Sequence, residues 1–534
     1  MTRKKRGKND NSFIAATRVV AGMTLISRLL GLTRDMVCSR IFGVGEVWSS
    51  FALAFLIPNL FRRLFGEGAL SAAFIPTYTR LLKEDRKTAE RFARLVMLVV
   101  MVFLSLLVLL GEILLFLLLT ATPIGETGGL AIRLTMIMLP YMPMICAVAL
   151  LGGMLQVHGR FAPTAAAPII LNLCIIAAAT LLLADIRAVA LAVLVAGVMQ
   201  VSWSLFALKG NIDWRGPVSD VSSHMKKMLR LAGPMLIGLG ALQLSTFLDG
   251  IIAGYPVTFG KYLPQWMPGS LAGATYPLDE ASNAVLFYGQ RLYQFPLGVF
   301  GIAIATAIYP SLSKLADDQT EFTSVLQKGL RLSLYIALPA SIGLVLVARP
   351  LAATLFLGGK FDAFGVERVA AVLAAYATAV WAYAMNHLLT RAFYARNDSK
   401  TPVRVSLIYL FLNLVLNLSL IWIMGERGLA WATSVCAVLQ CVTLLVLLNH
   451  RLGKAGQTLL TGELFRGVMW TVIISIMMSI AVSAWLKFAQ PGGGHWSDWA
   501  LLLAGSVVTG VVVYLFLSLV TRRPETTWLL SRHD

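Results

Sequence analysis

The feature that most constrains this chain is a series of apolar stretches long enough to cross a membrane. Leu95–Thr120 holds a single charged residue, Glu112, and Gly467–Leu486 holds none. About 20 apolar residues in a helix span the roughly 30 Å of hydrocarbon in a bilayer. Only 13% of the residues are charged, whereas soluble domains carry about 25%, so too few polar segments exist to cover a soluble core. The sequence therefore predicts an all-α polytopic membrane protein.

The apolar segments and the loops between them predict about fourteen transmembrane helices. Their expected ranges are 13–33, 44–64, 95–119, 131–155, 164–184, 188–208, 231–253, 283–309, 331–349, 369–390, 404–424, 428–448, 467–487 and 499–520. With the N-terminus inside, the nominally cytoplasmic segments hold more than three times as many Lys and Arg residues as the periplasmic loops. Because cytoplasmic loops are enriched in these residues, we expect a multi-pass protein of the bacterial cytoplasmic (inner) membrane with both termini in the cytoplasm.

The formal net charge of +19 is typical either of a nucleic-acid partner or of basic membrane loops. Because the basic residues concentrate on one expected side, the second explanation is favoured and no nucleic-acid partner is expected. The basic segment MTRKKRGK at residues 1–8 is not followed by a signal-peptide cleavage pattern. It is interpreted as a cytoplasmic end that leads into a retained first helix.

The reactive residue types form no catalytic or metal pattern in the sequence. The five cysteines lack C-x-x-C spacing and lie mostly in apolar runs, so neither a disulfide framework nor a metal site is expected from them. The sequence also lacks a nucleophile elbow, a P-loop and a metal-spaced histidine pair. We expect a protein that is not an enzyme, needs no cofactor apart from the sodium ion considered below, and uses a gradient or membrane potential rather than ATP.

An internal repeat divides the chain. ALSAAFIPTYTRL at Ala69–Leu81 is matched by AIATAIYPSLSKL at Ala303–Leu315, and shorter landmarks at residues 93–95 and 159–163 recur at nearly the same spacing. Six helices per repeat is an even number, so both copies enter the membrane in the same direction, and such parallel repeats enclose a cavity at their interface. The expected domains are an N-lobe (1–208), a C-lobe (209–448) and two additional C-terminal helices (449–534).

Several arginines fall inside the expected helices: Arg28 in the first, Arg62 and Arg63 in the second, and Arg291 in the eighth. An arginine near the bilayer centre costs at least a few kcal/mol, so it is retained where it faces a wet cavity or a partner. For any single one, the alternative is a snorkelling side chain or a structural ion pair. Together they outnumber the embedded carboxylates, and guanidinium groups bind phosphate oxygens bidentately. We therefore expect a cationic cavity that receives an anionic substrate.

Two further polar sets within the expected helices leave their roles open. Arg34 and Asp35, at the outer end of the first helix, are either a periplasmic gate pair or an interfacial salt bridge. A second set combines one carboxylate with neutral oxygen atoms from two other helices: Asp249, Asn413, Asn417 and Thr433. Such a set could hold a monovalent cation such as sodium, although polar membrane residues also commonly make interhelical hydrogen bonds.

Four segments together resemble a known family. They are SRLLGLTRD (Ser27–Asp35), IPNLFRRLFGEGALSAAFIP (Ile57–Pro76), RLYQFPLGVFGIAIATAIYPSLS (Arg291–Ser313) and FYARNDSKTP (Phe393–Pro402). Over nearly its whole length the chain is similar to the MurJ or MviN family of lipid II flippases, within the multidrug/oligosaccharidyl-lipid/polysaccharide exporter superfamily. The resemblance implies a V-shaped pair of six-helix lobes around a cationic cavity, a lipid-tail groove formed by the last two helices, and transport by alternating access.

The resemblance also implies roles for individual residues. It implies substrate binding by the residues that match the family's cavity arginines, Arg28, Arg62 and Arg291. It implies gate or supporting roles for Arg34, Asp35, Glu67 and Arg63. Some relatives bind sodium at positions that match Asp249, Asn413, Asn417 and Thr433, with aspartate in some relatives where this chain has Asn417. The chain has Ser49 where an acidic residue is frequent in the family.

The function that we expect is flipping of lipid II, whose anionic headgroup would move from the cytoplasmic to the periplasmic face. A polysaccharide or O-antigen lipid flippase of the same superfamily is the main alternative, and a drug/cation antiporter is disfavoured by the surplus of arginine. A membrane-embedded glycosyl- or phosphotransferase would need a carboxylate pair or a histidine near the membrane surface, which we do not find. Expected partners are lipid II (an undecaprenyl-pyrophosphate-linked disaccharide peptide), membrane lipids and the cell-wall synthesis machinery.

Overall fold

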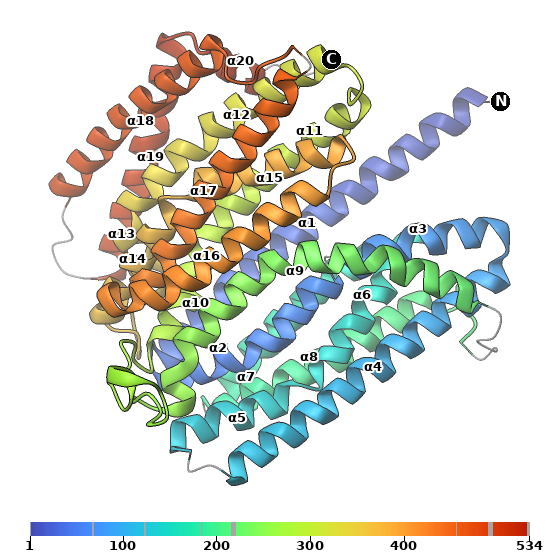
Figure 1. Ribbon diagram of the computed structural model, residues 1–534, viewed down its shortest axis with the longest axis vertical. Helices are drawn as coiled ribbons and strands as arrows, with labels where there is room; N and C mark the ends of the chain where they lie inside the picture. Colours follow the sequence, from blue (N-terminus) through green and yellow to red (C-terminus); the bar gives the residue numbers. More distant parts are fainter. Residues whose placement is uncertain are drawn as a thin grey trace. The chain divides into compact units, whose positions relative to one another are not determined.

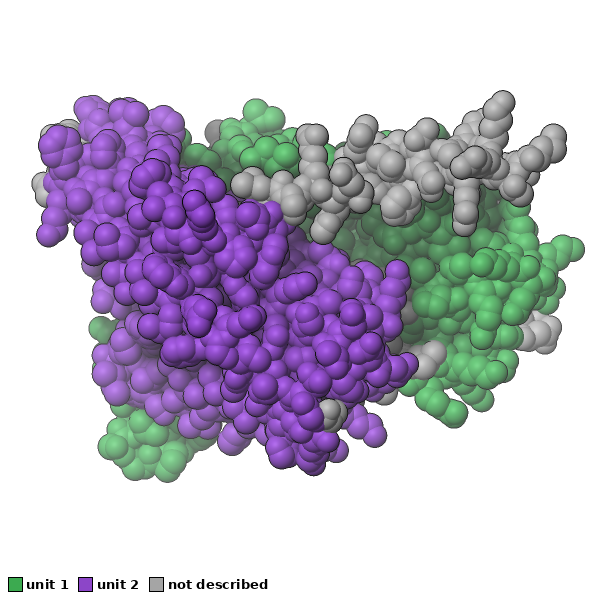
Figure 2. Space-filling view, turned by 90° about the horizontal axis from the view of Figure 1, so that it is seen from above, with its two compact units in different colours: residues 1–284 green, residues 285–534 purple. Residues whose placement is uncertain are grey.

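A computed structural model describes residues 2–66, 69–121, 124–182, 184–214, 221–454, 456–489 and 495–530. The chain forms two compact units, Met1–Ala284 and Val285–Asp534 (Figure 2). Helices make up nearly all of the described chain, and the pairings outside them are two isolated bridges, Tyr262 with Thr275 and Gly358 with Phe361. The expectation of an all-α protein is confirmed.

The first unit is built from long helices that pack side by side (Figure 1). They are α1 (Thr2–Phe42), α2 (Glu46–Phe61), α3 (Ala69–Glu84), α4 (Arg86–Ala121), α5 (Glu126–Met138), α6 (Tyr141–Val157), α7 (Ala162–Leu181), α8 (Ile186–Leu208) and α9 (Ser222–Phe259). A π-helical turn, Arg62–Gly66, follows α2 directly. Helices α1 and α7 form one of the closest pairs in this unit, as do α7 and α8.

The second unit continues in the same style after α10 (Ser282–Pro296), whose first residues belong to the first unit. A π-helical turn, Leu297–Gly301, follows α10. The remaining helices are α11 (Ile302–Lys314), α12 (Gln319–Leu346), α13 (Ala348–Phe356), α14 (Ala363–Ala377), α15 (Val380–Ala395), α16 (Lys400–Met424), α17 (Glu426–Gly453), α18 (Gly462–Phe488), α19 (Trp496–Val520) and α20 (Pro524–Leu530).

All fourteen expected transmembrane ranges fall on helical segments of the structure. Among the described residues, nine helices or continuous helix pairs are long and apolar enough to span a membrane, or up to 10 if the bent pair α14 and α15 is one span. The other expected spans lie in α1, in α2 with the π-helical turn after it, in α9, and in α10 with α11. The first, second and last of these contain arginines within the expected range. A multi-pass membrane protein is confirmed, while the count of fourteen stays a prediction.

The helix α4 shows directly why this chain needs a lipid environment. Its most apolar window is only 6% buried, and residues such as Phe103, Leu106 and Phe116 are more than half exposed. Soluble proteins rarely expose a continuous apolar surface of this size. In a bilayer the apolar side chains of α4 would face apolar lipid. The backbone is also suited to lipid, because all backbone hydrogen bonds of a helix lie within the helix.

Segment 65–94 differs from the sequence-based expectation, which placed a loop between the second and third transmembrane helices. The structure has α3 at Ala69–Glu84 and begins α4 at Arg86. Hydroxyl and charged residues such as Thr77, Arg80 and Lys83 interrupt the apolar residues of α3, and Asp85 caps α4 through the backbone N–H groups of Lys87 and Thr88. Hydropathy averaged over a membrane-length window misses a helix of this amphipathic kind.

The internal repeat is visible in matching irregularities of the two copies. The π-helical turns Arg62–Gly66 and Leu297–Gly301 occupy equivalent positions, just after the second helix of the first repeat and its counterpart α10. In the second turn, the N–H of Ile302 donates to the carbonyl of Leu297, five residues earlier. Such a turn contains one residue more than an α-helical turn and is frequent at functional sites.

A second matching irregularity lies after α6 and after α15. Gly159 and Asn397 both have positive φ values, 73° and 58°. The next residue then donates its N–H back into the helix, from Arg160 to the Leu155 carbonyl at 2.8 Å and from Asp398 to Phe393 at 3.0 Å. This is the hydrogen-bond pattern of a helix that ends in a left-handed residue. The same device at the same place in both copies supports the repeat read from the sequence.

Candidate substrate site

Arg34 and Asp35 form a buried pair near the end of α1. The Arg34 guanidinium donates to Asp35 Oδ1 from Nη2 at 2.7 Å and from Nε at 3.0 Å. Arg34 is 8% exposed and Asp35 3%, so the pair is buried, and its role as a gate pair or as an interfacial salt bridge stays a prediction. Within low-dielectric surroundings such a charge-assisted pair holds both side chains in one geometry.

Asn172 on α7 completes this arrangement, and sequence reasoning did not single it out. Its amide oxygen accepts from Arg34 Nη1 at 3.1 Å, and its amide nitrogen donates to the Ser27 carbonyl at 3.2 Å. A Cβ at Gly31 would lie 3.6 Å from this nitrogen. The sequence did contain a sign that Asn172 has a role, because it is a polar residue in the middle of the apolar segment PIILNLCIIA. One amide therefore holds α1 at both ends of the two helical turns from Ser27 to Arg34.

Arg28 follows Ser27 directly in the first of these two turns, and its side chain is exposed. On α2 and the following π-helical turn, Arg62 donates to Asn59 Oδ1 at 3.2 Å from both Nε and Nη2. Arg63 donates from Nη1 to Gln243 Oε1 on α9 at 2.9 Å. In these contacts the acceptors of both arginines are the neutral amide groups of Asn59 and Gln243.

Arg291 belongs to α10 in the second unit. Its guanidinium carbon lies 4.9 Å from the centre of the Phe287 ring, one helical turn earlier, which is a cation–π contact. The neighbouring Gln290 donates to the Tyr376 hydroxyl at 3.2 Å. Arg28, Arg62 and Arg63 belong to the first unit, so the convergence of these arginines with Arg291 stays a prediction. Glu67, the remaining residue with an expected supporting role, lies outside the described residues.

The expected sodium set is divided between the units. In the second unit, Asn417 donates from Nδ2 to Asn413 Oδ1, Asn413 donates from Nδ2 to Thr433 Oγ1, and each distance is 3.2 Å. Asn413 and Asn417 are buried on α16, and Thr433 belongs to α17. Asp249 on α9 in the first unit is also buried. The oxygen ligands suit sodium chemically, and the same chain of hydrogen bonds joins α16 to α17.

Ser49 begins to explain a departure from the family pattern. Its hydroxyl oxygen accepts from the backbone N–H of Ala284 at 3.0 Å, and its carbonyl accepts from Asn283 Nδ2 at 3.1 Å. Ala284 lies in the first turn of α10, where backbone N–H groups have no partner within the helix. A side chain of α2 therefore caps the helix that carries Arg291.

Charged groups in the loops are tuned by their immediate partners. Burial, followed by the neighbouring Glu46 carboxylate, raises the pKa of the Glu280 carboxyl above its ordinary value. Burial alone would also raise the pKa of Asp398, but hydrogen bonds from Thr401 and Arg451 outweigh it and lower that pKa. Asp398 thus stays ionised and links the loop after α15 to Arg451 on α17.

The described residues contain no group of three or more His, Cys, Asp or Glu side chains placed to hold a metal ion. Membrane-length helices in two repeated units, with arginines carried inside the helices, define a multi-pass membrane protein of the transporter class. A family model described as "Lipid II flippase MurJ" matches residues 38–502. The chain therefore belongs to the MurJ family of lipid II flippases, as the resemblance indicated.

Individual relatives agree with this assignment. The chain is 32% identical over 522 residues to a probable lipid II flippase MurJ of Vibrio cholerae, covering 93% of this chain and 94% of the relative. It is 32% identical over 448 residues to the lipid II flippase MurJ of Burkholderia cenocepacia, covering 82% of this chain and 84% of the relative. Both relatives thus match over most of their own length.

Solved structures show the same fold. A lipid II flippase MurJ in an inward closed conformation matches with a TM-score of 0.76 at 22% identity, covering 94% of this chain and 98% of the other. An inward-facing multidrug resistance MATE family transporter of the MOP superfamily matches with a TM-score of 0.62 at 15% identity, covering 82% of this chain and 98% of the other. The fold is therefore shared by transporters of different substrates and does not itself define the substrate.

Proposed function

We propose that this protein flips lipid II across the bacterial inner membrane, with both termini in the cytoplasm. The observation that carries the proposal is the family match over residues 38–502, together with 32% identity to the relative from Vibrio cholerae over 93% of the chain. The proposed partner is an undecaprenyl-pyrophosphate-linked disaccharide peptide, held among membrane lipids. Proteins of the cell-wall synthesis machinery are proposed as partners on the same basis.

The proposed binding step follows from the chemistry of arginine. Arg28, Arg62 and Arg291 would receive the pyrophosphate, because a guanidinium group offers paired N–H donors that match phosphate oxygens. The amide contacts of Arg62, at 3.2 Å to Asn59, orient its guanidinium. Asn172 would orient the turn of Arg28 through the Ser27 carbonyl. Arg34, Asp35, Glu67 and Arg63 would support or gate this site.

The proposed transport step is alternating access, in which the headgroup site opens first to one side and then to the other. Helix kinks occur where the regular hydrogen-bond ladder is broken, and both π-helical turns, Arg62–Gly66 and Leu297–Gly301, break it. They are suited to bending α2 and α10 at equivalent positions of the two repeats. No covalent step is needed, so we propose a transporter without enzymatic activity.

Sodium coupling is proposed as a secondary feature. Asp249, Asn413, Asn417 and Thr433 would hold the ion, which would supply positive charge and a link to the sodium gradient. The test is thermal unfolding of the purified protein in NaCl against equal choline chloride. Stabilisation by sodium that disappears in Asn417→Leu supports the proposal, and equal unfolding in both salts contradicts it.

The flippase function is tested with lipid II reconstituted with the protein in liposomes. The protein should move labelled lipid II between leaflets, and Arg28→Ala should abolish this movement while the protein remains inserted. An undecaprenyl-linked O-antigen precursor is the comparison substrate, because a polysaccharide flippase would prefer it. Preference for the O-antigen precursor, or no movement of either lipid, contradicts the proposal.

A further inference from the structure

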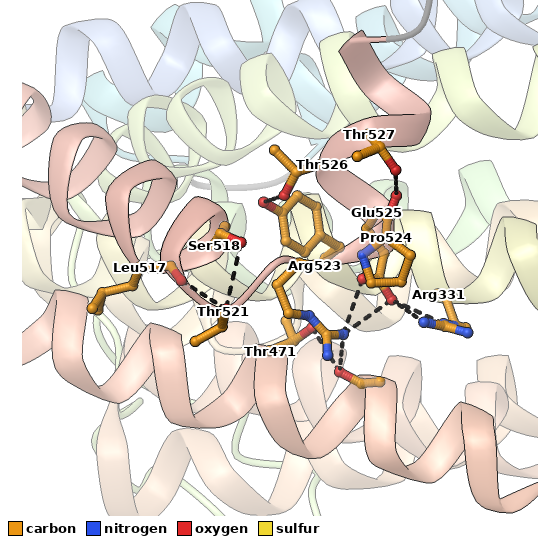
Figure 3. Close-up of polar contacts among 12 residues, drawn as sticks. Arg331, Thr471, Leu517, Ser518, Thr521, Arg523, Pro524, Glu525, Thr526 and Thr527 are labelled. Atoms are coloured by element: carbon orange, nitrogen blue, oxygen red, sulfur yellow. Dashed lines mark hydrogen bonds and ion pairs between the residues drawn. The ribbon is translucent and has the colours of Figure 1, made fainter.

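A buried cluster of charges joins the short helix α20 to α12 within the second unit (Figure 3). Glu525 is 1% exposed and accepts from Arg331 of α12, at 2.8 Å from Nε and 2.7 Å from Nη2. Arg523, which is 6% exposed, donates from Nη2 to the same Oε1 atom at 3.0 Å. Figure 3 shows both guanidinium groups reaching this one carboxylate. The cluster therefore contains two cations and a single anion.

Helix α18 contacts this charge cluster at Gly467. The Gly467 carbonyl accepts from Arg523 Nη2 at 3.1 Å. A Cβ at Gly467 would lie 2.9 Å from Arg331 Nε and 3.4 Å from Glu525 Oε1. Any larger residue at this position would push against the ion pair, so the absence of a side chain lets α18 approach α12 and α20 closely.

The backbone turn after α19 places Glu525 in the charge cluster. Arg522 has a positive φ of 49°, and the N–H of Arg523 donates to the Ser518 carbonyl at 2.9 Å. This is a helix C-terminus closed by a left-handed residue, here without the glycine that would adopt it most easily. The chain consequently reverses within a few residues and places α20, which has seven residues, against α12.

A second layer of contacts joins the same elements. The Tyr335 hydroxyl on α12 is hydrogen-bonded to Thr526 Oγ1 at 3.0 Å, and the Tyr514 hydroxyl on α19 donates to the Tyr335 carbonyl at 2.6 Å. The Arg331 guanidinium carbon also lies 5.1 Å from the centre of the Trp528 ring. Helices α12, α18, α19 and α20 are thus tied together at one end.

These polar contacts lie next to an apolar contact between the same helices. The apolar cluster of α12, α18 and α19 contains Tyr335, Ile474, Met478, Val482 and Tyr514, with Val347 after α12. Arg331 and Gly467 lie one or two turns before the first members of that cluster on their helices. At the far end, Trp496 at the start of α19 donates to the Thr354 carbonyl on α13 at 2.8 Å. On the other side of the charge cluster, Leu464 at the start of α18 belongs to the same apolar cluster as Leu326 and Leu330 of α12. The charge cluster therefore adds polar contacts between two apolar regions of these helices.

Removing the carboxylate has a different consequence from removing an exposed charge. Without Glu525, the guanidinium groups of Arg331 and Arg523 would face each other with no anion between them. A buried charge that loses its partner is strongly unfavourable, far more than a surface pair that is broken. Separation of α20 from α12, with entry of water, would be the way to relieve it.

We propose that Glu525 is a positioning residue that fixes the helix pair α18 and α19 on α12, so that all three helices move as one body during transport. Only the statement that the three helices move as one body during transport rests on the proposed function. The predicted latch consists of Glu525, Arg331, Arg523 and the Gly467 carbonyl.

The latch is tested by hydrogen–deuterium exchange of the full-length protein in lipid nanodiscs, without lipid II. In Glu525→Gln, amides in the first turns of α18 and in α20 should exchange at least tenfold faster than in the wild type. The matched control is Glu463→Gln, because Glu463 is an exposed carboxylate in the first turn of α18. The control should exchange like the wild type.

A charge-swapped variant separates the ion pair from a general loss of structure. Arg331→Glu combined with Glu525→Arg keeps the total charge and re-forms an ion pair between α12 and α20. It also places the new cation beside Arg523, so it should restore part, not all, of the protection lost in Glu525→Gln. If Glu525→Gln fails to insert, Tyr335→Phe, which loses only the contact to Thr526, should give a smaller rise in exchange at the same amides. Wild-type exchange in both single variants, or no recovery in the swapped variant, overturns the proposal. Because no lipid II is present, this outcome is independent of the flippase assay.

Discussion

The amide oxygen of Asn172 accepts a hydrogen bond from the Arg34 guanidinium at 3.1 Å, and this bond joins α7 to α1. The other end of the same amide holds the Ser27 carbonyl at 3.2 Å. Asn172 therefore contacts α1 on both sides of the turn that carries Arg28. The position of a proposed substrate-binding arginine thus depends on a residue from a neighbouring helix.

Replacing Asn172 with leucine should weaken both the fold and transport. The change preserves approximate volume but leaves the buried Arg34 guanidinium without one acceptor, which costs about 1–3 kcal/mol. Thermal unfolding in detergent should occur at a lower temperature, and the flipping rate should fall. Thr180→Val on the same helix is the control, because Thr180 is exposed and its hydroxyl bonds within α7. Equal loss in both variants would show that Asn172 has no special position.

Replacing Arg28 or Arg291 with alanine should abolish transport while the protein remains inserted. Losing charge-assisted hydrogen bonds to a phosphate costs about 1.5–3 kcal/mol, which corresponds to about a tenfold to hundredfold loss of affinity. The measurement is complementation in a strain that depends on the variant, with membrane levels checked by blotting. Arg133→Ala, at an exposed arginine of α5, should support growth. Normal growth with Arg28→Ala or Arg291→Ala alone would refute the role of that arginine.

Ser49→Ala should destabilise the start of α10. The variant loses the hydroxyl that caps the N–H of Ala284, and loss of such a cap costs about 0.5–2 kcal/mol. The neighbouring Ser50→Ala is the control, since the Ser50 hydroxyl bonds to the Glu46 carbonyl within its own helix at 2.8 Å. Unfolding temperatures of the two variants should differ, with Ser49→Ala the lower. If they coincide, the cap does not stabilise α10.

The stability contributed by Asp398 should depend on pH in a defined direction. Its pKa is lowered in the folded protein, so its contribution is complete above the ordinary aspartate pKa of about 4 and is lost as the pH falls below that value. The difference in unfolding temperature between the wild type and Asp398→Asn should therefore be large at pH 7 and shrink steadily as the pH falls below about 4. Asp317→Asn, at an exposed carboxylate, should show no such trend. A difference that is independent of pH would contradict the prediction.

The positions of the membrane helices could be predicted from sequence because segments that cross a bilayer are rich in apolar residues. Segments such as Lys400–Met424 and Trp496–Val520 are apolar on average over a membrane-spanning length, and their helical form follows from the need to satisfy backbone hydrogen bonds. The amphipathic α3 was harder to predict, since hydroxyl and charged residues lower its average hydropathy. The π-helical turns could not be predicted from hydropathy at all.

The site was predictable in its residue types but not in its contacts. Arginines inside apolar helices are costly, so Arg28, Arg62 and Arg291 stood out by their position alone. Asn172 did not stand out, because asparagine in a membrane helix is commonly explained by helix packing. Its role depends on which helix lies beside α7, and that pairing is not written in local sequence. The same holds for Glu525, whose two arginine partners come from α12 and from the turn after α19.

The most direct test of the central claim is to deplete the protein from its own bacterium and measure on which face of the inner membrane lipid II accumulates. A membrane-impermeant enzyme that cleaves lipid II in the periplasm provides the measurement. The account predicts that lipid II remains on the cytoplasmic face and becomes resistant to cleavage, and that the wild-type protein but not Arg28→Ala restores cleavage. Lipid II that stays accessible from the periplasm after depletion would contradict it.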